Sequence, residues 1–504
     1  MIVYSCKCEK YIKGIKKMNR LTLIIITSLI LILVVGGCNS YINPMNTNHH
    51  HSNDHDSAVG HDHDMPLESS TGENELKLPP VLESDKETED EVYYTIEAKK
   101  GETEIFDGVM TETLGYNNSF LGPVVKLEKG QTANIHFKNS LDEPTTIHWH
   151  GLIVDGEADG GPHDVIKPGE EKDIIFNVEQ DDATLWFHPH PEGQTAKQVF
   201  NGLAGLLYIE NDEENPYEYG ENDFPLILQD RTFNDEKQLD YEDIKDEDGT
   251  MGETLLINGT LNPYLPVNKE KVRLRLLNGS NMRNYTIKLS NGGSFEQIAS
   301  DGGLLNEPVE LTELELTPSE RAEIIVDFSK TEADEDLSLI MDDDTELLPF
   351  EIKETEVNEV EKEMKEVKNP VTITEEELNQ PVTKKIELFG MGKHVTINGK
   401  QFDKGRIDLT QEKGETEIWE VYNKPDKMGG MVHPFHIHGT QFKVISINDK
   451  EPPEHLKGYK DTISLEPDDR VKLAVKFEEE GIYMYHCHIL EHEDNGMMGQ
   501  VKVE

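Results

Sequence analysis

The chain has 504 residues, enough for about three domains of ordinary size, and its 35% of hydrophobic residues is typical of a soluble protein with a packed core. It carries 100 Asp and Glu against 48 Lys and Arg, a formal charge of -52, so its surface repels nucleic acid and attracts cations, although the charge could also serve solubility in a salty or alkaline habitat. The cysteines are Cys6, Cys8, Cys38 and Cys487, and because three of them lie near the N-terminus, a disulfide framework for the body of the protein is excluded.

The first 37 residues have the pattern of an export signal. Basic residues between positions 7 and 20 precede an apolar run over residues 21–38, which is near the lower length limit for a membrane-spanning helix. The run ends in Val-Gly-Gly-Cys38 and resembles a bacterial lipoprotein signal, which implies that Cys38 is lipidated and becomes the first mature residue. An uncleaved membrane anchor is the alternative. In either case we expect an exported protein held at the cell surface or at the extracytoplasmic face of the membrane.

Residues 38–92 are polar and poor in large apolar side chains, which predicts a disordered tether. Six of the chain's 20 histidines lie here, beside several aspartates. Such a tract can bind copper or zinc loosely, and it can equally be a solvated linker, because it has no fixed ligand geometry. The six are His49, His50, His51, His55, His61 and His63.

Short strand-like runs separated by Gly, Pro and Asp turns fill the rest of the chain in three groups. The first group (93–212) includes TANIHFKNS, the second (222–330) includes KVRLRLLNGS, and the third (386–504) includes TEIWEVYN. Between the last two groups, the acidic stretch 331–385 is expected to be an exposed linker, in which EVNEVEKEMKEVKNP could form a short helix. The pattern predicts an all-β protein with three β-sandwiches in series.

The histidines of these groups are not spread evenly. Four are scattered, at His136, His163, His394 and His455, and ten fall in four short clusters whose shared unit is His-x-His. Side chains alternate faces in an extended chain, so residues i and i+2 point the same way, with Cα atoms roughly 6.5–7 Å apart. Four such pairs supply too many imidazoles for one ion, which indicates a metal cluster. The ten are His148, His150, His188, His190, His433, His436, His438, His486, His488 and His492.

A second kind of site is indicated by Cys487, which stands between two of these histidines and therefore points to the opposite face from both. A thiolate, two imidazoles and a weak axial methionine form a blue-copper site. His492 and Met497 follow Cys487 at intervals of five residues, and His433 is out of phase with the His-x-His pair after it, so it can face the thiolate. An electron accepted at Cys487 would then have a short through-bond path to the cluster.

All four clusters, in this order, resemble the copper signatures of the multicopper oxidases, a family that includes laccases, bilirubin oxidases and bacterial cuprous oxidases. The resemblance covers about residues 93–504 and is most specific in the first and third groups of strands. It implies three consecutive cupredoxin-like Greek-key β-sandwich domains with a three-copper cluster between the first and the third. It also implies an enzyme that takes single electrons from a reducing substrate and reduces dioxygen to water.

Carried over by position, the resemblance implies four copper ions per chain, with no ligand missing. The last segment taken alone would also suit a simple blue-copper electron carrier. The type 1 ion would be bound by His433, Cys487, His492 and Met497, the type 2 ion by His148 and His436, and the two type 3 ions by His150, His188, His190, His438, His486 and His488.

Two acidic residues are candidate catalytic groups, because water formation consumes protons that nearby acids must supply. Asp159 lies in the GEADGG loop after the first cluster, and Glu493 directly follows His492. Both match acidic positions near the copper cluster of the family. Ordinary surface carboxylates are the alternative.

The reducing substrate is less well defined. Segments such as HILEHEDNGMMG are most similar to the cuprous oxidase and spore-coat laccase branch. In the cuprous oxidases, methionines and acids near the type 1 copper hold Cu(I). Met428 and Met431 precede His433 and could bind Cu(I) through soft thioether sulfur, or they could simply pack. Gly429 stands where those enzymes have an Asp, and their long methionine-rich insertion is absent.

Three functions stay open. The first is oxidation of Cu(I) or another metal ion in copper tolerance, the second is laccase activity on phenols, and the third is copper sequestration at the cell surface. The expected partners are dioxygen, a reducing substrate and, through the lipid, a membrane. We expect a monomer that binds no nucleic acid.

Overall fold

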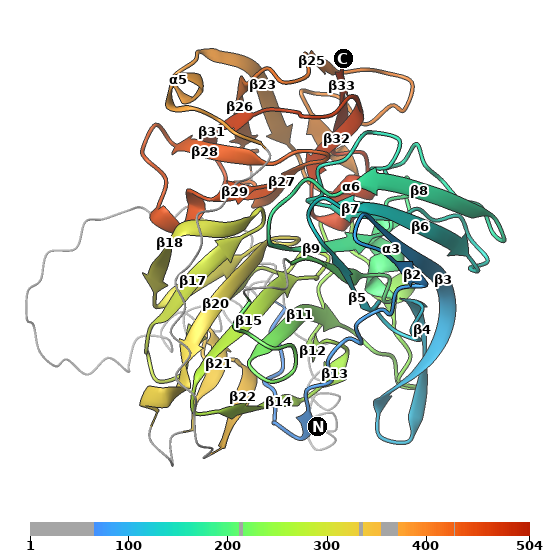
Figure 1. Ribbon diagram of the computed structural model, residues 1–504, viewed down its shortest axis with the longest axis vertical. Coiled ribbons are helices and arrows are strands. Elements are labelled where there is room, and N and C mark those ends of the chain that lie inside the picture. The colour runs from blue at the N-terminus through green and yellow to red at the C-terminus, as the bar shows by residue number, and fades with distance from the viewer. Residues whose placement is uncertain (1–64, 211–214, 332–335, 354–370, 428) are drawn as a thin grey trace, which may run out of the picture. The chain divides into compact units, whose positions relative to one another are not determined.

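A computed structural model of the chain describes residues 65–210, 215–331, 336–353, 371–427 and 429–504. The predicted signal segment, Cys38 and the histidine tract lie outside the described residues. Within the described residues nearly all secondary structure is strand, which confirms the all-β prediction. The strands form six sheets, two for each of three sandwiches that follow one another along the chain (Figure 1).

The first sandwich encloses a core that includes Ile96, Phe137 and Phe187. Every second residue from Val92 to Ala98 is buried, which is the alternation expected of a sheet with one face on the core. Helix α3 (Thr195–Phe200) precedes its last strand. One sheet contains β2 (Lys86–Glu87), β3 (Glu91–Phe106), β4 (Val109–Tyr116), β6 (Thr132–Asn139) and β8 (Glu171–Asn177), and the other contains β5 (Val124–Leu127), β7 (His148–His150), β9 (Ala183–His188) and β10 (Gly205–Ile209).

The second sandwich shares an apolar interface with the first, because Ile227 and Leu277 of its larger sheet pack with Trp186 and Tyr208. This explains why β11 is buried along its whole length. The larger sheet has the order β13 (Thr260–Leu261), β12 (Thr254–Ile257), β11 (Asp223–Arg231), β15 (Lys271–Asn278), β20 (Arg321–Asp327), β17 (Phe295–Ser300), β18 (Gly303–Leu311). The smaller sheet has the order β1 (Asn74–Glu75), β14 (Pro263–Asn268), β22 (Glu346–Lys353), β21 (Ser338–Met341), β16 (Tyr285–Leu289), β19 (Glu313–Leu316), and the short helices are α4 (Tyr241–Ile244) and η3 (Phe328–Lys330).

The third sandwich is built around Trp419, Phe435 and Tyr485. One sheet has the order β24 (Thr396–Ile397), β23 (Val382–Phe389), β26 (Glu417–Lys424), β31 (Arg470–Val475), β28 (Phe442–Ile447), β29 (Tyr459–Lys460). The other has the order β25 (Leu409–Gln411), β33 (Met498–Val503), β32 (Gly481–Cys487), β27 (His433–Ile437), β30 (Thr462–Leu465). The helices are α5 (Glu375–Leu378), α6 (Leu490–Asp494), η4 (Gly392–His394) and η5 (Glu454–Leu456).

The predicted tether 38–92 is wrong for residues 65–92. Strand β1 pairs in parallel with β14, and Leu67 and Leu76 are buried in the core of the second sandwich. Strand β2 pairs with the start of β3. Isolated leucines among polar residues do not stand out in average composition, so the segment was misread as a tether.

The predicted linker 331–385 is also wrong in part. Residues 338–353 form β21 and β22, which complete the smaller sheet of the second sandwich. Val371 and Ile373 are buried beside Ile418 of the third sandwich. The acidic residues of this stretch mask short apolar runs such as SLIM and ELLPF, which the two strands use. The suggested helix before Pro370 lies outside the described residues.

Candidate metal centre

The four histidine clusters lie on, or shortly after, two pairs of hydrogen-bonded strands. In the first sandwich, β7 pairs antiparallel with β9, so that His148 lies opposite His188. In the third, β27 pairs antiparallel with β32, so that His436 lies opposite His486. Strands β7 and β27 carry histidines that meet where the first and third sandwiches face one another (Figure 1). The register therefore aligns histidines that are distant in sequence.

Eight histidines from these strands form one buried cluster. Their ring nitrogens approach closely, with 3.4 Å between His150 Nδ1 and His188 Nε2, and 3.1 Å between His438 Nε2 and His486 Nε2. Three sets of three histidines have potential ligand atoms within 4.8 Å of one another. The eight are His148, His150, His188, His190, His436, His438, His486 and His488, and none is more than 1% exposed.

Several nitrogens of this cluster fit a bound metal better than they fit any protein partner. His148 Nε2, His436 Nε2 and both ring nitrogens of His488 are buried and accept or donate no hydrogen bond. A buried polar atom without a partner costs about 1–3 kcal/mol, so several in one place call for a ligand. Burial also lowers the pKa of His148 and His438, which keeps the imidazoles in the neutral form that binds metals.

A second group lies wholly within the third sandwich. The ligand atoms of His433, Cys487 and His492 are within 4.8 Å of one another, and Cys487 Sγ is 3.7 Å from His492 Nδ1. The Nε2 atoms of both histidines are buried without a partner. Met497 is fully buried in the same core, and its carbonyl accepts the Cys487 N–H at 3.1 Å. Burial raises the pKa of the Cys487 thiol, so a bound metal is needed to hold the thiolate at neutral pH.

Each of the two predicted acids contacts histidines of the cluster. Asp159 Oδ2 is 2.8 Å from His438 Nδ1, and the Asp159 carbonyl accepts from His148 Nδ1 at 2.9 Å. A Cβ at Gly160 would lie 1.7 Å from the Ile147 carbonyl oxygen, so only glycine lets this loop come so close to the first cluster. Both contacts are made to the Nδ1 atom of a histidine, and they fix the orientation of the two imidazole rings.

Glu493, on helix α6, contacts two other histidines of the cluster. Its Oε1 is 3.2 Å from His190 Nδ1, and its Oε2 is 3.5 Å from His486 Nδ1. Glu493 is 3% exposed, so the surface-carboxylate alternative is wrong for it, as it is for Asp159 at 2%. Burial raises the pKa of both carboxyl groups.

The structure adds an acid that the sequence analysis missed. Asp461 Oδ1 is 3.0 Å from His150 Nε2, and Asp461 is held by Arg321 of the second sandwich. Asp461 belongs to no histidine cluster and is 25 residues from His436, whose Nδ1 donates to its carbonyl. Only the pairing of strands shows that Asp461 is near the cluster, because the next residue, Thr462, lies opposite His436 in the ladder.

The scattered histidines His136 and His163 belong to neither group, and of the two candidate methionines only Met431 lies within the described residues. His136 is on the surface beside Asp173, and His163 contacts Gln500. Met431 is half-buried and packs against the core of the third sandwich. Met428 lies outside the described residues.

Comparison with known proteins places the chain in a family. Three family models described as multicopper oxidase match residues 97–214, 208–337 and 375–504. The multicopper oxidase mco of Staphylococcus haemolyticus (strain JCSC1435) is 53% identical over 446 residues, which cover 88% of this chain and 95% of that protein.

Two solved structures extend the comparison to the fold. A laccase from Pediococcus acidilactici Pa5930 is 44% identical with a TM-score of 0.80, covering 87% of this chain and 95% of its own. A multicopper oxidase from Campylobacter jejuni, described as a metallo-oxidase, is 30% identical with a TM-score of 0.72, covering 87% and 97%. The prediction of three cupredoxin-like Greek-key domains is confirmed by these similarities. The chain belongs to the multicopper oxidase family and is a copper-dependent oxidoreductase that uses dioxygen and a reducing substrate.

Proposed function

We propose that the chain binds four copper ions in the two groups described above. The type 1 ion takes His433, Cys487, His492 and Met497, the type 2 ion takes His148 and His436, and the type 3 pair takes His150, His188, His190, His438, His486 and His488. The observation that carries this proposal is the set of buried, unpartnered imidazole nitrogens around both groups.

The residues of β32 join electron entry to the cluster. Copper ions held by these residues would supply one-electron redox chemistry between a reducing substrate and dioxygen. The Cys487 side chain lies with His433 and His492, while the side chains of its covalent neighbours His486 and His488 point into the histidine cluster. The backbone between them therefore gives an electron a route of only a few bonds. Both groups are buried, so this route lies away from bulk water.

Glu493 and Asp159 are proposed to carry the protons that water formation consumes. They contact different histidines of the cluster, so they serve two of its sides. Both are buried next to the place where oxygen is reduced, within hydrogen-bonding reach of the ligating rings. The same contacts fix the orientation of those rings.

We propose Cu(I), or another oxidisable metal ion, as the reducing substrate, in a role in copper tolerance. A formal charge of -52 concentrates cations at the surface. Met431 lies two residues before His433 and packs against the core that holds Cys487. The similar multicopper oxidase from Campylobacter jejuni is described as a metallo-oxidase, which supports a metal ion as the substrate.

A phenol is the second candidate, favoured by the similarity to the Pediococcus laccase. Dioxygen uptake by the copper-loaded protein separates the two. Faster uptake with Cu(I) than with a phenol at matched concentration supports metal-ion oxidation. The reverse order would replace it with laccase activity.

The direct test of the type 1 assignment is Cys487→Ser. We expect the variant to lose its intense blue absorption and one copper per chain, and to keep the copper of the cluster. Met498→Leu is the matched control, since Met498 is buried beside the same strand and is not a proposed ligand. A blue Cys487→Ser protein would contradict the assignment.

The N-terminal predictions remain proposals: export, lipidation at Cys38 and attachment to a membrane surface. Among the described residues, no helix is both long and apolar enough to cross a membrane. Membrane fractionation of Cys38→Ser tests the proposed lipid anchor, and its release into the soluble fraction is the expected result.

A further inference from the structure

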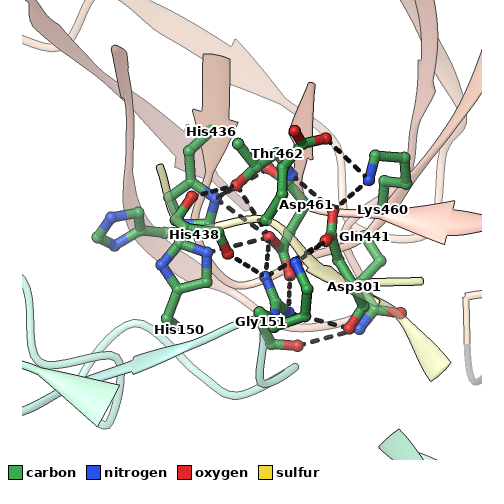
Figure 2. A network of polar contacts seen from close by, with 12 residues as sticks. His150, Gly151, Asp301, His436, His438, Gln441, Lys460, Asp461 and Thr462 are labelled. Atoms are coloured by element: carbon green, nitrogen blue, oxygen red, sulfur yellow. Dashed lines mark hydrogen bonds and ion pairs between the residues drawn. The ribbon is translucent and has the colours of Figure 1, made fainter. Parts of the chain in front are cut away.

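Asp461 touches two histidines of the cluster that come from different domains (Figure 2). Its side-chain Oδ1 is 3.0 Å from Nε2 of His150, on β7 of the first domain. Its main-chain carbonyl accepts from Nδ1 of His436, on β27 of the third domain, at 2.8 Å. Asp461 thus contacts one ring nitrogen of each histidine, and the other ring nitrogen of each is left to face the cluster.

Arg321, the first residue of β20 in the second domain, holds Asp461 in this place. Its Nη1 and Nη2 donate to the two carboxylate oxygens of Asp461, at 2.8 and 2.6 Å. The remaining donors go to the carbonyls of Thr184, Ser319 and Asp301, so all five guanidinium N–H groups have partners. Arg321 and Asp461 are fully buried, and a bidentate pair of this kind fixes direction as well as distance.

The pair belongs to a larger buried network with an excess of negative charge. Lys460 Nζ is 2.9 Å from Asp301 and 3.1 Å from Glu320, and these three side chains are almost fully buried. With Asp461 and Arg321, the network holds three carboxylates and two cations. A buried net negative charge is unfavourable unless a positive charge lies near it. The adjacent cluster is where bound metal ions would supply that charge.

We propose that Asp461, clamped by Arg321, is a positioning residue that presents His150 and His436 to copper, which gives the second domain a part in a cluster to which it contributes no ligand. This inference rests on the proposed function. The inference goes further than the proposed function, because it states that a contact among three domains raises the affinity of the cluster for copper.

The test compares Asp461→Asn with Asp223→Asn in the full-length copper-loaded protein. Asp223 is an equally buried aspartate that pairs with Arg273 and Arg275 between the first two domains. We expect Asp461→Asn to weaken copper binding at the cluster by about 10–100-fold in competition with a chelator. The electron paramagnetic resonance signal of type 2 copper should shift, and the blue absorption should stay. Asp223→Asn should change neither copper affinity nor the signal.

Unchanged copper affinity and an unchanged type 2 signal in Asp461→Asn would overturn the inference, and so would equal effects in both variants. If Asp461→Asn does not fold, Arg321→Lys keeps the charge and loses the bidentate geometry. It should shift copper affinity in the same direction, and wild-type affinity in this variant would contradict the proposal. Wild-type protein that takes up copper only at the thiolate group would instead contradict the proposed function itself.

Discussion

Two sets of buried ionisable side chains in this protein differ in whether the protein itself supplies their partners. The cluster histidines are neutral and leave nitrogens unpartnered, so they are built to receive a metal. Asp223, by contrast, is fully satisfied by arginines. Burial would raise the pKa of Asp223, but the guanidinium groups of Arg275 and Arg273 outweigh this effect and lower it from 3.8 to about 2.

The lowered pKa of Asp223 predicts a specific acid sensitivity. A group with a depressed pKa in the folded state contributes stability above its unfolded pKa and loses it as the pH falls through the folded value. We expect wild type to lose ~2 kcal/mol of stability from this group between about pH 4 and about pH 2. The Asp223→Asn variant should lack this pH-dependent contribution to stability. The difference between the melting temperatures of wild type and variant should therefore become smaller as the pH falls. A gap that is constant with pH would contradict the prediction.

At the scale of elements, strand β1 is the least expected part of the fold. The segment holds only isolated apolar residues, yet Leu76 is 6% exposed and its N–H donates to the Tyr264 carbonyl. Composition therefore misassigned it to the tether. Any deletion meant to remove the histidine tract should stop at residue 64, because a deletion through residue 92 also removes β1 and β2.

Leu76→Ala should destabilise the second domain by about 2–5 kcal/mol, since it removes a buried leucine from the core and leaves a cavity. Glu75→Ala is the control, because Glu75 is the exposed neighbour of Leu76 and is the last residue of β1. Urea unfolding of the two variants measures the difference. Equal midpoints would show that burial of Leu76, directly after β1, contributes nothing to the sandwich.

Sequence reasoning placed the histidines and Cys487 well because their chemistry depends on local alternation along a strand, which His-x-His spacing displays directly. It could not place Asp461 or Arg321. Their roles depend on how three domains meet, and such contacts leave no periodic trace in a single sequence. The strands of residues 338–353 were missed for a simpler reason: their flanking acids resemble those of a linker.

At the scale of the whole folded unit, one contact between the first and third domains is made by two glycines, Gly156 and Gly481. The Gly156 N–H donates to the Glu480 carbonyl, and a Cβ on Gly156 would lie 2.8 Å from Gly481 Cα. Nothing larger than hydrogen fits between these backbones. The contact keeps the histidines of β7 and β27 at a fixed separation.

Gly156→Ala should therefore push the two domains apart. We expect dioxygen uptake to fall by up to about 10²-fold, because misplacement on the order of 1 Å is costly for a multi-residue site. The blue absorption should persist, since the proposed type 1 ligands all lie in the third domain. Gly405→Ala is the control, because the nearest atom to its Cβ is 3.4 Å away. Loss of the blue colour with retained cluster copper would contradict this account.

The division of histidines between two domains has a consequence for biosynthesis. A ribosome completes residues 148–190 long before residues 433–488, so half of the cluster's rings must wait for the other half. Until the third domain has folded against the first, no pocket exists that could discriminate copper from other ions. We therefore expect metal insertion at the cluster to be a late event in maturation, whereas the proposed thiolate site needs residues of the third domain alone.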